Sequence, residues 1–390
     1  MKFLIKINTR FIFVFLFSLL ILAFLNPFYI WIWPSGLIVL FLILSVVTSF
    51  YTNDIYCKNR AGFAFLVSLL SFFYLFANDA SVAGALALVA PIMMLLSMSD
   101  KVVVAVFDRF KSIYVVLLLP GIFLWFVHHI FGFDVLYLGE IPSEYIKNKF
   151  KVDAGQGYAL YPFAIVMDYM LSYSVYRFIG FLDEPGFVGT VSGLLISLKG
   201  FDKKSKRDYV IFLAGVISFS LAFYVIVFVY YAIRSMFKFR FFIFMLFFSG
   251  FIYMASSYNE TVNKYLVSRV MVVDGVVQGN NRVTSGLDSS FNEWLYGDLE
   301  KFMFGLNGYS PDGSSSWKEI PVKSGFVGCV LLIFIFATIY YPRSRGRMVN
   351  VGFISFFAVF ILSIYQRPYV VSPFFVLIFV NSLIGNSERR

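Results

Sequence analysis

Long apolar runs recur along the whole chain, and they constrain its fold more than any other feature. The chain has 390 residues, of which 60% are hydrophobic and 14% are charged. A soluble domain is roughly 45–50% apolar, and a transmembrane helix needs roughly 20 mostly apolar residues. The sequence therefore predicts an all-α, polytopic membrane protein with a single transmembrane domain over residues 1–390. The apolar runs are 11–25, 28–50, 61–77, 82–98, 112–131, 186–198, 209–233, 241–255, 324–341, 349–365 and 369–385.

The first run follows basic residues and therefore has the order of a signal peptide. No small-residue cleavage site follows it, because the chain continues through Asn26 and Pro27 into the next apolar run. We expect this first run to be retained as a membrane span.

Basic residues between the runs predict the orientation of the chain. Lys and Arg concentrate in cytoplasmic loops, and most of the short connections here are basic. This rule places both termini in the cytoplasm and two long loops, 132–185 and 256–323, outside it. The net charge of +10 then reflects orientation rather than nucleic-acid binding, because the basic residues are spread over many inner segments.

The run 209–233 does not fit a single crossing, because basic residues flank it on both sides. Two short crossings that turn near residues 218–220, or a re-entrant pair, restore the alternation. Non-helical backbone is tolerated at membrane depth where protein or a watery cavity surrounds it. We predict a broken helical pair at 209–233 and about 12 crossings in all.

Histidine and cysteine are too sparse to indicate a metal site or a cofactor. The two cysteines, Cys57 and Cys329, are far apart, and the two histidines, His128 and His129, are adjacent. A zinc site needs more ligands at suitable spacing. We interpret the histidines as interfacial polar residues and expect no metal.

The first long loop ends in the stretch 177–189, RFIGFLDEPGFVG, which concentrates charge before an apolar run. One interpretation is a helix start at Pro185, capped by Asp183 or Glu184. The other is a phosphate site, because arginine is the preferred fork for phosphate oxygens and Glu184 is a candidate proton acceptor. Gly180 would let a substrate approach the backbone. Before this stretch, we expect residues 158–176 to form an interfacial or partly buried helix.

The second long loop is rich in groups that recognise sugars and anions. It offers Trp294 as an aromatic platform, with Arg269, Arg282 and Lys323 as cations, although a plain solvated loop has a similar composition. Arg367 lies at a further outer turn. Several arginines on the outer face of a chain that keeps most of its basic residues inside indicate an anionic ligand there.

The order of these elements resembles bacterial O-antigen polymerases of the Wzy type, within the O-antigen polymerase and ligase superfamily. Residues 1–150 match that family only in hydropathy. The elements that carry the resemblance are Arg177-x-x-Gly180-x-x-x-Glu184-Pro185, Ser220, Arg282, Trp294, Phe304-Gly305-Leu306-Asn307, Ser324-Gly325-Phe326-Val327-Gly328 and Gln366-Arg367-Pro368.

The resemblance implies a GT-C-like glycosyltransferase of the bacterial inner membrane. Its substrates would be glycans linked to undecaprenyl pyrophosphate, and a chain-length-regulating polysaccharide co-polymerase is a candidate partner. Arg282 and Arg177 are the first candidates for stabilising the leaving pyrophosphate, followed by Arg367 and Arg269. Glu184 is the first candidate for activating the acceptor hydroxyl.

Several assignments stay open at this stage. Asp183 is the rival of Glu184, and either carboxylate can instead only pair with Arg177. Lys323 stands where many relatives carry an acidic residue, so it is either a phosphate contact or a snorkelling interface residue.

Two other functions compete with the polymerase. An O-antigen ligase shares the architecture that this chain resembles. Ligases have a functional histidine in the large outer loop, whereas residues 256–323 of this chain contain none. A flippase or other transporter for lipid-linked oligosaccharides tends to carry internal repeats and charges at mid-membrane depth. Neither feature is evident in this sequence.

Overall fold

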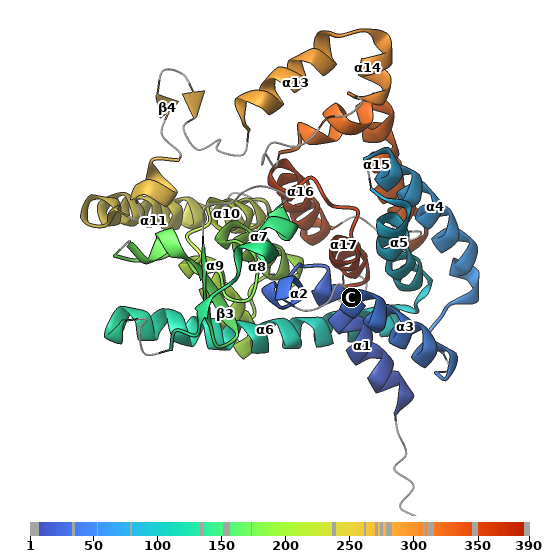
Figure 1. Cartoon of the computed structure of the whole chain (residues 1–390), viewed down its shortest axis with the longest axis horizontal. Coiled ribbons are helices and arrows are strands. Elements are labelled where there is room, and N and C mark those ends of the chain that lie inside the picture. Colours follow the sequence, from blue (N-terminus) through green and yellow to red (C-terminus); the bar gives the residue numbers. More distant parts are fainter. Residues whose placement is uncertain are drawn as a thin grey trace, which may run out of the picture.

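The chain folds into a bundle of helices with a smaller helical layer on one side (Figure 1). All structural statements concern the residues that the computed structural model describes. These are residues 8–32, 36–52, 54–78, 80–132, 136–150, 157–172, 174–235, 239–260, 263–269, 272–273, 276–277, 283–306, 309, 316–344 and 350–385.

Helices occupy every predicted apolar run. The run 28–50 is divided into two helices, and the run 112–131 is the second part of a longer one. The helices are α1 (Thr9–Ala23), α2 (Phe28–Ile32), α3 (Gly36–Phe50), α4 (Ala61–Ala77), α5 (Val82–Ser97), α6 (Asp100–Phe131), α8 (Pro185–Lys199), α9 (Lys206–Ile217), α10 (Leu221–Arg234), α11 (Phe239–Tyr258), α15 (Glu319–Ser344), α16 (Val351–Gln366) and α17 (Pro373–Gly385).

Three of the described helices are long and apolar enough to cross a membrane on length and composition: Lys58–Ala77, Asp100–Phe131 and Glu319–Arg343. Shorter apolar helices accompany them. The chain therefore has the architecture of a helical membrane protein, and the number of about 12 crossings stays a prediction.

Helix α17 forms the centre of the bundle (Figure 1). Its side chains from Pro373 to Ile384 are all buried, and it contacts α5, α6, α8 and α15. A helix that is apolar on all sides is either buried in a protein core or surrounded by lipid, and the contacts of α17 show that it is buried in the bundle. The connection between α16 and α17 is thereby held at one end of the bundle.

The predicted break within 209–233 is present. Helix α9 ends at Ile217, α10 begins at Leu221, and Phe219 between them has φ +44°. Helix α8 packs closely on this break, since a β-carbon on Gly189 would collide with Ser220. Only a residue without a side chain fits there, so the glycine allows α8 and the break to approach each other.

The prediction of an interfacial or partly buried helix over 158–176 is wrong. Strands β2 (Tyr158–Tyr161) and β3 (Ala164–Met167) form a hairpin, and β1 (Gly139–Glu140) extends it to a three-stranded antiparallel sheet. Phe163 takes φ +60° in the two-residue turn, and such left-handed conformations are typical of tight hairpins. The hairpin packs against the bundle, so its tyrosines are buried rather than at a lipid interface.

The fold is thus mainly, but not entirely, α-helical. A second, two-stranded sheet pairs β4 (Val272–Val273) with β5 (Val276–Val277). The remaining elements of the two long loops are the helices α7 (Ser143–Phe150), α13 (Ser285–Tyr296) and α14 (Leu299–Phe304), the π-helix Asn263–Val267 and the 3-10 helix Asp168–Ser172; a further 3-10 helix, Lys58–Arg60, precedes α4.

Helices α13 and α14 lie outside the main bundle, next to the start of α15 (Figure 1). Leu287, Trp294 and Val322 form a small hydrophobic core of their own there. Helix α15 bends at Gly325, which has φ +63° and lies so close to Met303 that a β-carbon would collide with the Met303 backbone. The bend sets the direction of the first turns of α15.

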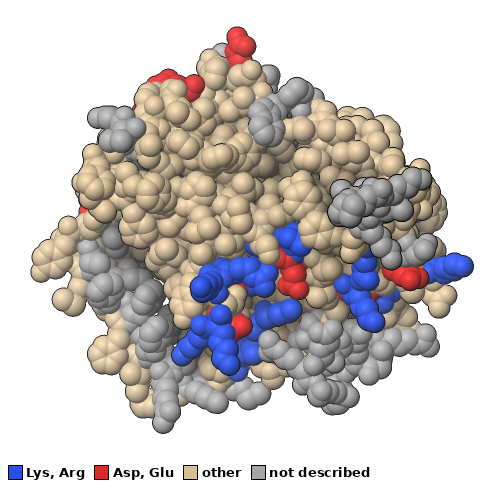
Figure 2. Space-filling view, turned by 90° about the horizontal axis from the view of Figure 1, so that it is seen from below, with Lys and Arg blue, Asp and Glu red and all other residues tan. Residues whose placement is uncertain are grey.

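Lys and Arg side chains gather in one region of the face shown in Figure 2. Arg10 of α1, Arg109 of α6 and Arg207 of α9 line a hollow of about 430 Å³, which we call the basic hollow. All three come from segments that the distribution of basic residues assigns to the cytoplasmic side.

Candidate functional site

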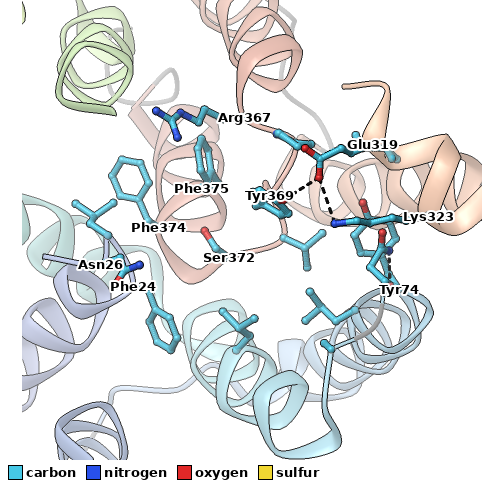
Figure 3. Close-up of a pocket in the computed structure, with 18 of the residues that line it drawn as sticks. Phe24, Asn26, Tyr74, Glu319, Lys323, Arg367, Tyr369, Ser372, Phe374 and Phe375 are labelled. Atoms are coloured by element: carbon cyan, nitrogen blue, oxygen red, sulfur yellow. Dashed lines mark hydrogen bonds and ion pairs between the residues drawn. The ribbon is translucent and has the colours of Figure 1, made fainter. Parts of the chain in front are cut away.

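A cavity of about 500 Å³ lies where helix ends from distant parts of the chain meet (Figure 3). The segments that form it follow α1, end α4, precede α8, begin α15 and connect α16 to α17. These are segments that the basic residues assign to the outer side. The lining residues are Phe24, Leu25, Asn26, Tyr74, Leu75, Asn78, Ala80, Leu88, Asp183, Phe187, Glu319, Ile320, Lys323, Arg367, Pro368, Tyr369, Val371, Ser372, Phe374 and Phe375.

The cavity wall combines apolar and charged surfaces. Phe24, Phe374 and Phe375 provide aromatic area on the side of α1 and α17, as Figure 3 shows. The charges come from Asp183, Glu319, Lys323 and Arg367. Mostly apolar pockets with a few convergent polar groups are typical of ligand sites, and this one suits a ligand that has both a charged and an apolar part.

Arg367 is the central cation of this wall. It follows α16 directly, and its backbone N–H bonds the carbonyls of Ser363 and Ile364. Its guanidinium pairs with the Glu184 carboxylate and lies 5.0 Å from the centroid of the Phe187 ring. The Arg367 side chain is 15% exposed. A planar guanidinium suits such a stacked and paired position better than an ammonium does.

The electrostatic surroundings of Arg367 are mixed. Burial lowers the pKa of Arg367, and the neighbouring Asp183 raises it. Arginine keeps its proton in proteins even under such conditions. The cavity therefore holds a permanent guanidinium cation at low solvent exposure, beside the carboxylates of Asp183 and Glu184.

Helix α8 begins at Pro185, as predicted, with Glu184 at its N-cap position. The Glu184 side chain makes no capping hydrogen bond, and its carboxylate pairs with Arg367 instead. An N-cap carboxylate ordinarily accepts a bond from the first turn of its helix. The local interpretation of this stretch is therefore correct for the helix start, but Glu184 contacts Arg367 and does not cap the helix with its side chain.

Glu319, Lys323 and Tyr369 form a second charged group in the cavity wall (Figure 3). The Tyr369 hydroxyl donates to Glu319 Oε2 over 2.8 Å, and the Lys323 ammonium donates to the same oxygen over 3.2 Å. Glu319 is 1% exposed. A carboxylate so deeply buried needs a cation beside it, and Lys323 provides one.

Sequence reasoning identified Lys323 but missed Glu319 and Tyr369. The spacing of Glu319 and Lys323 is i,i+4 in the first turns of α15, which places the two side chains on one helix face. That spacing was the signal available in the sequence. Lys323 lies in the cavity wall, and its ammonium is 5.5 Å from the Tyr369 ring centroid.

Arg177 and Gly180 are not among the residues that line the cavity. Arg177 is 8% exposed, and its Nε donates to the Ser218 carbonyl over 3.1 Å at the break between α9 and α10. Gly180 has φ +63°, and it lies close to α6, because a β-carbon on Gly121 would be 3.0 Å from the Gly180 Cα and 3.0 Å from the Phe178 ring. Both residues thus hold α6, the hairpin and the helix break together.

The residues predicted in the second long loop are also distributed differently. Trp294 is 8% exposed, donates from Nε1 to the Phe302 carbonyl over 3.0 Å, and stacks on the Phe302 ring at 5.3 Å. It belongs to the small core of α13 and α14. Arg269 is half-buried in the turn after the π-helix and is not a lining residue. Arg282 lies outside the described residues.

Among the residues described, no group of three or more His, Cys, Asp or Glu side chains is placed to hold a metal ion. Comparison of the chain with protein-family models, with curated proteins and with solved structures finds no match. A functional assignment therefore depends on the cavity, its charges and the order of the sequence elements.

Proposed function

We propose that the protein is a membrane glycosyltransferase, an O-antigen polymerase that joins repeat units linked to undecaprenyl pyrophosphate. The observation that carries this proposal is the position of Arg367. It is a little-exposed cation in a cavity with aromatic walls, at the end of the bundle where the outer connections meet. A lipid diphosphate has the matching parts: an anionic head and an apolar chain.

The charges of the cavity suit the departure of a diphosphate. In the reaction, the acceptor hydroxyl attacks the anomeric carbon of the donor, and the bond from that carbon to the diphosphate oxygen breaks. Negative charge grows on this oxygen, so a cation fixed before the reaction lowers the barrier. Arg367 is the first residue for this role, with Lys323 as a second cation in the same wall.

In this proposal, Glu184 positions Arg367 rather than acting on the acceptor hydroxyl. Its carboxylate contacts the guanidinium. The preceding residue, Asp183, lines the cavity. The incoming diphosphate would replace part of the Glu184 contact, because guanidinium groups bind phosphate oxygens in the same forked geometry as carboxylates. Arg177 and Gly180 support the scaffold, and Arg269 and Arg282 stay candidates for the other side of the site.

The proposed location is the bacterial inner membrane, with the cavity on the periplasmic side and both termini in the cytoplasm. This orientation follows from the basic residues of the inner segments. A chain-length-regulating co-polymerase is the proposed protein partner.

Deletion of the gene, followed by electrophoresis of the lipopolysaccharide, tests the proposal. Loss of a polymerase leaves lipid A–core with a single repeat unit, and re-expression of the wild-type protein restores the ladder. Loss of a ligase instead leaves core without any repeat unit, while long glycan accumulates on undecaprenyl lipid. Loss of a flippase leaves the repeat units on the inner face. Either of the last two patterns would overturn the proposal.

A further inference from the structure

We propose that Tyr369 and Glu319 form a proton-accepting pair for the acceptor sugar, with Tyr369 receiving the hydroxyl and Glu319 receiving the proton. This inference rests on the proposed polymerase function and assigns the acceptor side of the same cavity. The pair lies on α15 and on the connection between α16 and α17, both of which line the cavity (Figure 3).

The two residues differ in their exposure, and therefore in their accessibility to a substrate. Tyr369 exposes 57% of its surface, whereas Glu319 exposes 1%. The Tyr369 hydroxyl donates to Glu319 Oε2 over 2.8 Å, and a phenol oxygen can accept a further hydrogen bond while it donates one. A sugar hydroxyl in the cavity can therefore bond to Tyr369, while the carboxylate behind it is shielded from the sugar.

The charge state of the pair suits this direction of transfer. Burial raises the pKa of Tyr369, and the Glu319 carboxylate raises it further, so the phenol keeps its proton at neutral pH and donates it toward Glu319. Lys323 pairs with the same carboxylate oxygen. The other charged or titratable groups that act on Tyr369 are Arg367, in the same connection, and Tyr309, in the second long loop.

The second carboxylate oxygen is an independent sign of function. Glu319 Oε1 is buried and has no hydrogen-bond partner among the described residues. A buried acceptor without a donor lowers the stability of the fold. A catalytic role is one explanation for such a group in a native protein, and this one belongs to a residue in a cavity wall.

The proposed step conserves atoms and charge. The acceptor oxygen forms a bond to the anomeric carbon as its proton moves to the Tyr369 oxygen, and the Tyr369 proton moves to Glu319 Oε2. The bond between the anomeric carbon and the diphosphate oxygen breaks, and its electron pair leaves with the diphosphate beside Arg367. Tyr369 ends neutral, and Glu319 returns its proton to water before the next cycle.

The test uses the full-length protein in lipid nanodiscs. The substrate is the lipid-linked repeat unit extracted from a strain that lacks this gene, and chain growth is measured as initial rates over a range of substrate concentrations. The variants are Tyr369→Phe, Glu319→Gln and the double variant. Tyr365→Phe is the matched control, because Tyr365 is a nearby exposed tyrosine that does not line the cavity.

We expect each single variant to lower kcat about 100-fold, because proton transfer by a positioned group contributes roughly 10²–10⁴-fold. The KM should stay within about threefold of wild type, since the Tyr369 ring remains in Tyr369→Phe. The double variant should be no slower than the slower single variant, because the two residues act on one proton. The control should keep the wild-type kcat.

Two results would overturn the pair. One is a wild-type kcat in Tyr369→Phe, which retains the ring and does not depend on the folding of Glu319→Gln. The other is a double variant whose loss equals the product of the two single losses, since that indicates separate roles. Absence of chain growth with wild-type protein would instead overturn the polymerase function, and the pair with it.

Discussion

The cavity and the basic hollow hold their arginines in different ways. At the cavity, Arg367 is 15% exposed, contacts the Glu184 carboxylate and lies over the Phe187 ring. At the basic hollow, Arg10 and Arg207 are exposed, and Arg207 donates to the Ser112 hydroxyl over 3.0 Å. Desolvation makes the first cation costly to hold, whereas water stabilises the others.

This difference separates two uses of positive charge in one membrane protein. Exposed basic residues set the orientation of the chain, and each contributes little to stability. A cation held at low exposure in a cavity is retained at a cost in free energy, and such groups cluster at functional sites. Charge counts along the sequence do not distinguish the two, because solvent exposure decides between them.

Arg367→Ala should have the largest effect on the glycan ladder. We expect polymer formation to fall by roughly 10²–10³-fold, as it does when one fixed electrostatic contact to a developing charge is removed. Arg109→Ala, in the wall of the basic hollow, is the matched control and should leave the ladder intact. The measurement is the ladder at equal amounts of membrane-inserted protein. If both variants gave equal ladders, Arg367 would not be a functional residue of the cavity.

Gly325→Ala should lower stability by about 3 kcal/mol or more, because strain at positive φ adds to a collision with the Met303 backbone. The bend at Gly325 directs Glu319 and Lys323, so the ladder should weaken as well. Gly62→Ala is the control: no heavy atom lies within 4 Å of its new β-carbon. Thermal unfolding in detergent compares the two variants. An unchanged transition in Gly325→Ala would contradict the bend as a structural requirement.

Arg177→Ala should lower the free energy of unfolding by about 1–3 kcal/mol, because the Ser218 carbonyl at the helix break loses its donor. Some ladder should remain wherever folded protein is present. Thermal unfolding and the ladder are measured on the same preparation. A stably folded variant without any ladder would indicate that Arg177 takes part in the reaction. The contrast between Arg177 and Arg367 would then be weaker.

Arg207→Ala should have the smallest effect. The side chain is exposed at the basic hollow, so we expect no measurable change in the unfolding temperature or in the ladder. A lost ladder with normally folded protein would show that the basic hollow also takes part in function, and the division between the two regions would fail.

Much of the fold was predictable because apolar runs and basic connections act locally. The helices, the break between α9 and α10 and the helix start at Pro185 all follow from patterns of a few neighbouring residues. The hairpin at 158–167 did not follow, because its tyrosines suit both a membrane interface and a buried strand. Pairing with β1 and packing on the bundle decide between the two.

The candidate site was predictable only in part. Arg367, Asp183 and Lys323, which were predicted as site residues, line the cavity. Trp294 of α13 is a residue type that can form a sugar platform, yet it is buried against α14, because its Nε1 and its ring both contact Phe302. Glu319 was not predicted as a site residue, because a single acidic residue in a polar loop is ordinary.

The sequence by itself determined that this chain has the architecture of a helical membrane protein and predicted that its basic connections lie on one side, because hydrophobic length and charge bias are properties of short segments. Only the tertiary structure decided which charges meet. Glu184 contacts Arg367, and Tyr369 contacts Glu319, across separations of 183 and 50 residues, respectively, in the chain. Such pairings depend on how α8, α15 and α16 pack together, and packing is a property of the whole bundle.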